Sequence, residues 1–174
     1  MTLNPLEKPE TTWAGEFERF FQTPVALEAG RPLAAGAQIR LKLRASPQEA
    51  VEADLLFRRT RSGQEIRLVS GLDPKEISPQ LTFELSLEQA RTILTHPTHE
   101  VGSYGVLIVR EIFHSQPEAR IRFQLHAGFL TLFRLGYWGV LTAGGPSFAS
   151  ELASRGFSGM NAIKSALQKL RASP

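Results

Sequence analysis

The sequence predicts an α+β fold, with a single antiparallel sheet of five to six strands and helices packed on one face. Several short segments alternate apolar and polar residues, and short turns separate most of them, which is typical of antiparallel strands. The patterns follow the order helix, four strands, helix, two strands and three helices. The 174 residues, 42% of them hydrophobic and 21% charged, fit one folded domain. We expect residues 1–10 to be a flexible lead and residues 11–171 to be that domain.

The first helix is predicted after residue 10, where Thr11 or Thr12 can cap its amino end. Its aromatic residues recur at helical spacing and share one face, which favours burial against the sheet. Pro24 is expected to end this helix, and a loop rich in Gly, Pro and Ala should follow over residues 30–36. The aromatic residues are Trp13, Phe17, Phe20 and Phe21.

The first four strands are predicted from alternation. Over residues 37–45, isoleucine and leucine alternate with arginine and lysine, which gives one dry face and one basic face. Residues 51–59 and 65–70 form a hairpin, in which Gly63 supplies the turn conformation. The fourth strand carries Leu81, Phe83 and Leu85 inward.

A capping box, Ser86 with Gln89 three residues later, predicts a helix that stops before Pro97. Residues 101–113 are apolar on both faces of an extended chain, so we expect a central strand there. A last strand is expected from Arg120 to His126.

Residues 129–143 are predicted as one apolar helix that Gly144 ends. Fifteen helical residues span about 22 Å, too little to cross a bilayer, and Arg134 lies midway. We therefore expect this helix to be buried, either by protein or by an apolar ligand. A short helix should follow up to Gly156, and an amphipathic one after Ser158 should carry Ile163, Leu167 and Leu170.

The sequence gives little support for catalysis. It has no cysteine, only two aspartates, and none of the common nucleophile, phosphate-loop or zinc motifs. His96 and His99 share a loop, but the predicted pairing puts His126 about 16 Å away, too far for a shared metal ion. We predict that the protein is not an enzyme and needs no cofactor or metal.

Charge narrows the class of partner. The net charge is +3, and residues 119–174 alone carry seven Lys and Arg against one Glu. Such a segment would suit an anionic membrane surface or an acidic partner, but a solvated face with scattered Lys and Arg is the simpler interpretation. Nucleic acid is an unlikely partner, because the strand aromatics alternate away from the basic face and offer no stacking platform there.

Location is predicted as cytoplasmic. Residues 1–10 contain no apolar stretch of the kind found in secretory signals, and no window reaches the 18 apolar residues of a membrane span. The absence of cysteine is compatible with a reducing compartment.

The stretch ISPQLTFELSLEQARTILTH, followed by EVGSYGVLIVRE, resembles sterol carrier protein domains. Leu81, Phe83 and Leu85 match the family's strand, Ser86 its helix cap, and Gly102 and Gly105 its glycine segment. The resemblance covers about residues 12–110. It implies a layered α+β domain with a hydrophobic tunnel that holds a lipid, sterol, quinone or fatty acyl chain.

We therefore predict an apolar small molecule bound between sheet and helices, without chemistry. The expected ligand-binding residues are Phe83, Val106, Ile108, Phe123, Phe129, Phe133 and Tyr137. The alternative is a structural or assembly protein that uses the helix at residues 129–143 as a partner or homo-oligomer interface.

Overall fold

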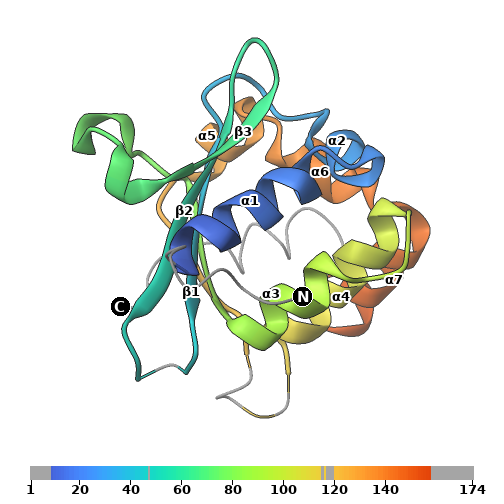
Figure 1. Ribbon diagram of the computed structural model, residues 1–174. Coiled ribbons are helices and arrows are strands. Elements are labelled where there is room, and N and C mark those ends of the chain that lie inside the picture. Colours follow the sequence, from blue (N-terminus) through green and yellow to red (C-terminus); the bar gives the residue numbers. More distant parts are fainter. Residues whose placement is uncertain (1–8, 47, 115, 117–119, 158–174) are drawn as a thin grey trace.

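The computed structural model describes residues 9–46, 48–114, 116 and 120–157. Its centre is a five-stranded sheet with the strand order β3-β2-β1-β4-β5 (Figure 1). The strands are β1 (Gln38–Arg44), β2 (Val51–Arg59), β3 (Gln64–Leu68), β4 (Leu81–Ser86) and β5 (Arg122–Leu125). The predicted α+β class and number of strands are confirmed.

The sheet is mixed, so the prediction of a purely antiparallel sheet is wrong. β1 pairs antiparallel with β2, as do β2 with β3 and β4 with β5, but β1 and β4 run parallel. Residues 69–80, which include η1 (Val69–Gly71) and η2 (Pro74–Glu76), carry the chain from edge strand β3 to the far side of β1. Alternation alone misses this crossover, because it is the same in parallel and antiparallel strands.

One face of the sheet is apolar. Leu41 pairs with Leu55 and with Phe83, and Leu43 pairs with Leu85, so inward side chains form rows across strands. α1 (Pro9–Phe21) packs against β2 and β3, and α3 (Leu87–Leu94) packs against β1 and β4 (Figure 1). The prediction for α1 holds, since Trp13 and Phe17 are buried in the resulting core.

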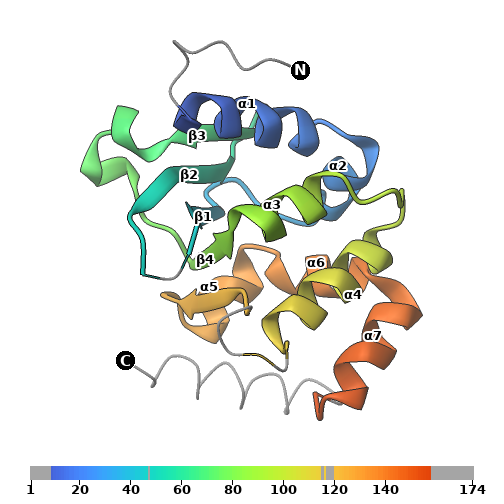
Figure 2. The ribbon, with the colours of Figure 1, turned by 60° about the horizontal axis from the view of Figure 1, so that its bottom comes forward.

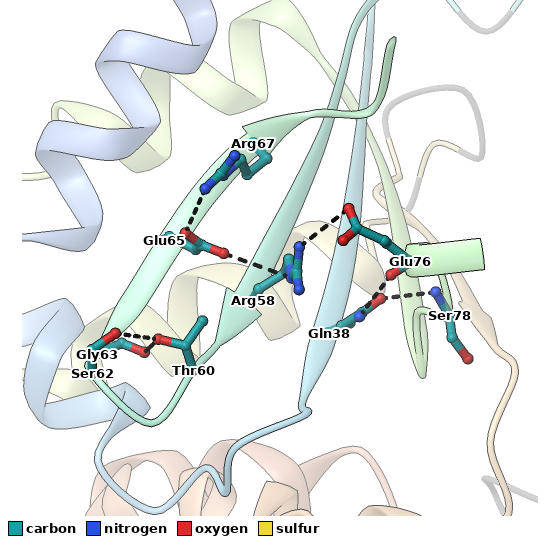
Figure 3. A network of polar contacts seen from close by, with 9 residues as sticks. All are labelled: Gln38, Arg58, Thr60, Ser62, Gly63, Glu65, Arg67, Glu76 and Ser78. Atoms are coloured by element: carbon teal, nitrogen blue, oxygen red, sulfur yellow. Dashed lines mark hydrogen bonds and ion pairs between the residues drawn. The ribbon is translucent and has the colours of Figure 1, made fainter. Parts of the chain in front are cut away.

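The opposite face carries paired charges. The Arg40 guanidinium donates two hydrogen bonds to the Asp54 carboxylate, with Nε 2.8 Å from Oδ1. Lys42 and Arg44 both lie within 4 Å of Glu84. Figure 3 shows the same pattern at the β2–β3 edge, where Arg58 contacts Glu65 and Glu76. These arginine and lysine side chains are therefore paired with carboxylates and do not form a free anion-binding surface. Additional members of the drawn network are Gln38, Thr60, Ser62, Gly63, Arg67 and Ser78.

Residues 101–113 form no strand. They form α4 (Val101–Ile112), a correction of the prediction, and α7 (Gly145–Ser154) lies alongside it (Figure 2). An added Cβ on Gly102 would lie 2.3 Å from the Gly144 carbonyl oxygen, and one on Gly105 would lie 2.6 Å from the Phe148 ring. A short apolar run has the same composition in a covered helix and in a central strand, and here the two glycines permit close helix packing.

The apolar helix predicted over residues 129–143 is broken into α5 (Phe129–Arg134) and α6 (Tyr137–Ala143). Gly136 adopts a left-handed conformation, with φ of 83°, between them. The chain's own core does not cover all of this segment, because Leu130 is 75% and Phe133 53% exposed, and its expected burial by a ligand or a partner stays a prediction. Only glycine fits at this turn, because an added Cβ on Gly136 would overlap the Pro32 carbonyl oxygen.

A further helix, α2 (Pro24–Gly30), occupies part of the region predicted as the end of the first helix and a loop. Pro24 begins this helix, and the Thr23 hydroxyl caps it by accepting a hydrogen bond from the Ala26 amide. The capping box at Ser86 and Gln89 is present as predicted. The predicted helix after Ser158 lies outside the described residues.

Gly15 offers a test of α1. An added Cβ there would meet no atom within 4 Å, and the residue lies inside the helix. Alanine loses less backbone entropy on folding than glycine, so we expect Gly15→Ala to raise the free energy of unfolding by about 0.5–1 kcal/mol. Chemical denaturation of both proteins measures the difference, and an unchanged or lower stability would contradict the local geometry.

Candidate functional site

A pair of aromatic residues lies on the apolar sheet face, where β4 pairs with the edge strand β5. Phe83 of β4 and Phe123 of β5 are cross-strand partners, and their ring centroids are 5.1 Å apart with an interplanar angle of 47°. Because side chains alternate along each strand, Thr82 and Gln124 point to the opposite face. The sequence prediction placed both phenylalanines correctly on the inward face.

This pair lies between two separate core clusters. Phe83 packs against the cluster that contains Leu85 and Ile93, whereas Phe123 packs against the cluster that contains Leu125 and Leu132. Leu85 and Leu125 are buried, but both phenylalanines are only half-buried. The accessible aromatic surface thus lies at the seam between two well-covered regions.

α4 supplies one wall of the first cluster. Tyr104, Leu107, Ile108 and Ile112 recur at helical spacing and pack against the cluster as half-buried side chains. The structure therefore places Ile108, a predicted site residue, on the same cluster as Phe83. Val106 is half-buried on another face of α4 and belongs to neither cluster.

α5 carries the next two predicted site residues. The rings of Phe129 and Phe133 are 6.3 Å apart and nearly parallel, and Phe129 is half-buried while Phe133 is exposed. Leu132 on the same helix points inward into the second cluster. Phe133 therefore lies on the outer side of α5 rather than in the core.

Tyr137 has a structural role. Its ring is buried in the second cluster, and its hydroxyl lies 3.0 Å from the Gln38 carbonyl oxygen and 3.1 Å from Gln80 Oε1. Both partners are acceptors, so the phenol must keep its proton to donate. Burial raises the pKa of Tyr137 well above its ordinary value of 10.0, against a smaller lowering by the Gln38 hydrogen bond.

This raised pKa predicts a pH dependence of stability. The folded state binds the phenol proton more tightly than the unfolded state, so the stabilisation is complete below about pH 10 and falls as pH rises above that value. Tyr137→Phe should remove this loss and cost about 1–2 kcal/mol at neutral pH, since the hydrogen bond is gone. Denaturation curves at pH 7 and pH 11 measure the free energy of unfolding of both proteins. An equal loss of stability between the two pH values in wild type and variant would contradict this role of Tyr137.

A groove that the sequence prediction missed lies between α1 and α3. Its volume is about 580 Å³. Its lining residues are Glu16, Arg19, Phe20, Thr23, Val25, Arg91, Leu94, Thr95, His96, Thr98, His99 and Tyr104. None of these residues belongs to the predicted ligand-binding set. The sequence signals were weak: His96 and His99 share a loop, and the helical spacing of Glu16 with Phe20 is one that any exposed helix face also shows.

The titratable groups described do not converge on a reaction centre. Nε2 of His126 lies 2.8 Å from the Thr82 hydroxyl, and His96 lies edge-on to the Tyr104 ring. Of the two aspartates, Asp54 holds Arg40 and Asp73 caps η2. Within the described ranges no three acidic or histidine side chains form a group that could hold a metal ion.

No family model matches the sequence, and no curated protein matches it. Among solved structures, the chain is similar to the "UbiJ-SCP2 Ubiquinone synthesis protein", with 9% identity, a TM-score of 0.40, and coverage of 78% of this chain and 96% of that one. It is also similar to sterol carrier protein domain 2 of Helicoverpa armigera, with 15% identity, a TM-score of 0.43, and coverage of 84% and 96%. Both titles name the family that the sequence resembles.

A third similar structure is the MycE methyltransferase from the mycinamycin biosynthetic pathway, in complex with Mg, SAH and mycinamycin VI. The identity is 19% and the TM-score 0.31, over 83% of this chain and 40% of that one. All three TM-scores are below 0.5.

Proposed function

We propose that the protein binds or carries an apolar small molecule, such as a lipid, sterol, quinone or fatty acyl chain, without catalysing a reaction. The ligand would lie on the apolar sheet face at the Phe83–Phe123 pair, between α4 and α5. The observation that carries this proposal is the half-burial of these two rings at the middle of strands whose flanking leucines, Leu85 and Leu125, are buried.

Accessible aromatic surface at this position is costly for a protein that binds nothing. Burial of apolar surface stabilises a protein by about 25 cal/mol for each Å² removed from water, and exposed surface lacks this stabilisation. A phenylalanine can bury about 150–250 Å², so partial exposure of two neighbouring rings on the apolar sheet face is unfavourable. An apolar ligand on the rings would recover that stabilisation, and Ile108 and Phe129 would supply further apolar contacts from α4 and α5.

The absence of catalysis is part of the proposal. Phe83 and Phe123 have no proton to transfer and no nucleophile, and Tyr137 is committed to two structural acceptors. The ligand would therefore leave the site unchanged, held by shape and apolar contact.

Native mass spectrometry with organic extraction tests this function directly. Protein purified from cells should carry an extractable apolar molecule, or should take up a fluorescent fatty acid or sterol after delipidation. A protein that is empty as purified and also fails to take up either probe would overturn the proposal.

A second function, assembly through α5, is favoured by one observation. Leu130 and Phe133 are exposed one helical turn apart, and within the described residues they are the most exposed large hydrophobic side chains. Such a pair suits a partner chain, a second copy or an anionic membrane surface beside Arg134. Light scattering over a wide concentration range tests self-association, because a protein that remains monomeric throughout would exclude a homo-oligomer at this helix.

The cytoplasmic location of the protein stays a prediction. No helix within the described ranges is both long enough and apolar enough to cross a bilayer. We propose a cytoplasmic protein that approaches membranes only at their surface, and fractionation of cells that express a tagged chain would test both parts.

A further inference from the structure

The groove between α1 and α3 combines surfaces from both helices. α1 contributes Glu16, Arg19 and Phe20, which lie on one stripe because they are three or four positions apart, and Thr23, the cap of α2, continues the lining. α3 contributes Arg91 and Leu94 in the same way. The two helices are neighbours (Figures 1 and 2), so these stripes face a common space of about 580 Å³. That volume is in the range of small-molecule sites.

The groove has an ordered apolar part. Phe20 meets the Tyr104 ring edge-on at a centroid distance of 5.5 Å, and His96 meets the same ring at 5.2 Å. The Tyr104 hydroxyl donates a hydrogen bond of 3.1 Å to the His96 carbonyl oxygen, which fixes the ring. Val25 and Leu94 extend this surface. A planar apolar group would find rigid aromatic edges here rather than mobile side chains.

Two arginines border the same space from opposite helices. Arg19 and Arg91 are exposed, and neither forms an ion pair with a residue in the part of the chain that the structure describes. The Arg91 guanidinium lies over the Trp13 ring at 5.8 Å, which restricts its position. Both arginines occupy the last turn of their helices, where the helix dipole favours a cation.

The geometry points to a second binding site, separate from the Phe83–Phe123 surface. We propose that this groove binds a small, planar apolar molecule that carries one carboxylate or phosphate group. The ring system would lie against Phe20 and Tyr104, and the anion would accept hydrogen bonds from Arg19 and Arg91. Guanidinium groups bind both kinds of anion through paired N–H donors, so the chemistry is shared. Glu16 leaves the groove with a surplus of one positive charge, which favours a single anionic group.

Titration calorimetry with three matched probes tests this site. The probes are 2-naphthoate, 2-naphthyl phosphate and the uncharged 2-naphthalenemethanol. We expect at least one anion to bind about tenfold or more tightly than the alcohol, because charge-assisted hydrogen bonds are the strong ones. A preference for the naphthoate identifies a carboxylate ligand, and a preference for the phosphate identifies a phosphorylated one.

Variants locate the binding. Arg19→Gln and Arg91→Gln should each lower the affinity for the preferred anion at least about fivefold and leave the affinity for the alcohol unchanged. Arg61→Gln, an exposed arginine in the β2–β3 turn, is the matched control and should have no effect. Equal affinities for anion and alcohol, no binding of any probe, or no effect of either arginine variant would overturn the proposal.

The test is independent of the proposed apolar function. Phe123→Lys alters the sheet surface and none of the residues that line the groove. It should therefore bind the preferred naphthyl anion with wild-type affinity even if it no longer takes up a fatty acid. Loss of anion binding in this variant would place the anion at the sheet rather than in the groove, and would also overturn the second site.

Discussion

Gly136→Ala is expected to lower the free energy of unfolding by at least about 3 kcal/mol. Two costs combine at this position. An alanine in the left-handed region costs about 1–2 kcal/mol on its own, and φ at Gly136 is 83°. The new Cβ would also overlap the Pro32 carbonyl oxygen, which belongs to the backbone and has little freedom to move.

The consequence extends beyond one residue because this corner joins α5 and α6 to the loop before β1. The Ala34 amide donates a hydrogen bond of 3.0 Å to the Leu135 carbonyl oxygen, next to Gly136. Tyr137 follows directly, and its hydroxyl donates a hydrogen bond to the carbonyl oxygen of Gln38, the first residue of β1. Displacing the corner therefore withdraws Tyr137 and Leu132 from the second core cluster.

Gly145→Ala is the matched control for this prediction. Gly145 also has a positive φ, of 67°, but an added Cβ there meets nothing within 4 Å. In the Gly145→Ala variant the free energy of unfolding should fall only by the cost of the left-handed conformation, about 1–2 kcal/mol. Chemical denaturation of the three proteins separates the two costs, and equal losses at both glycines would show that the Pro32 contact contributes nothing.

The second large effect is expected on ligand uptake, from Phe123→Lys. A lysine at this position removes an apolar ring from the proposed site and adds an ammonium group, which a bound apolar ligand would partly strip of water. We expect uptake of a fluorescent fatty acid or sterol to fall at least about tenfold. β5 is an edge strand and Phe123 is only half-buried, so the long lysine side chain can reach water and the fold should survive.

Two further variants keep this test specific. Gln124→Lys introduces the same charge one residue further along β5 but on the opposite face of the sheet, and should leave uptake unchanged. Phe123→Leu keeps the surface apolar and should retain uptake within about threefold. Circular dichroism and thermal unfolding confirm that each variant is folded. Normal uptake by folded Phe123→Lys would place the ligand elsewhere.

Local chemistry made several elements predictable from the sequence. The aromatic spacing of α1, the alternation in the strands and the reciprocal bonds of Ser86 and Gln89 each depend on residues within one element. The inward direction of Phe83 and Phe123 also follows from alternation alone, because a strand has only two faces. The direction of these two side chains was therefore predictable from the sequence.

Other features depend on contacts between segments that are distant in the sequence. β4 runs parallel to β1 because a crossover carries it past β2, and α4 packs closely on Gly144 and on Phe148 of α7 at Gly102 and Gly105. The bend at Gly136 depends on Pro32, about a hundred positions earlier, and the groove requires stripes from two helices that meet only after folding.

Composition, alternation and capping residues are enough to predict the class of the fold, the direction of most strand side chains and the caps of local helices. The sheet topology, the helical state of residues 101–112 and the choice of which apolar residues stay accessible depend on how the whole chain packs. Hydrophobic attraction has no direction, so an apolar pattern specifies that a segment is to be covered, and the packing of the chain selects what covers it.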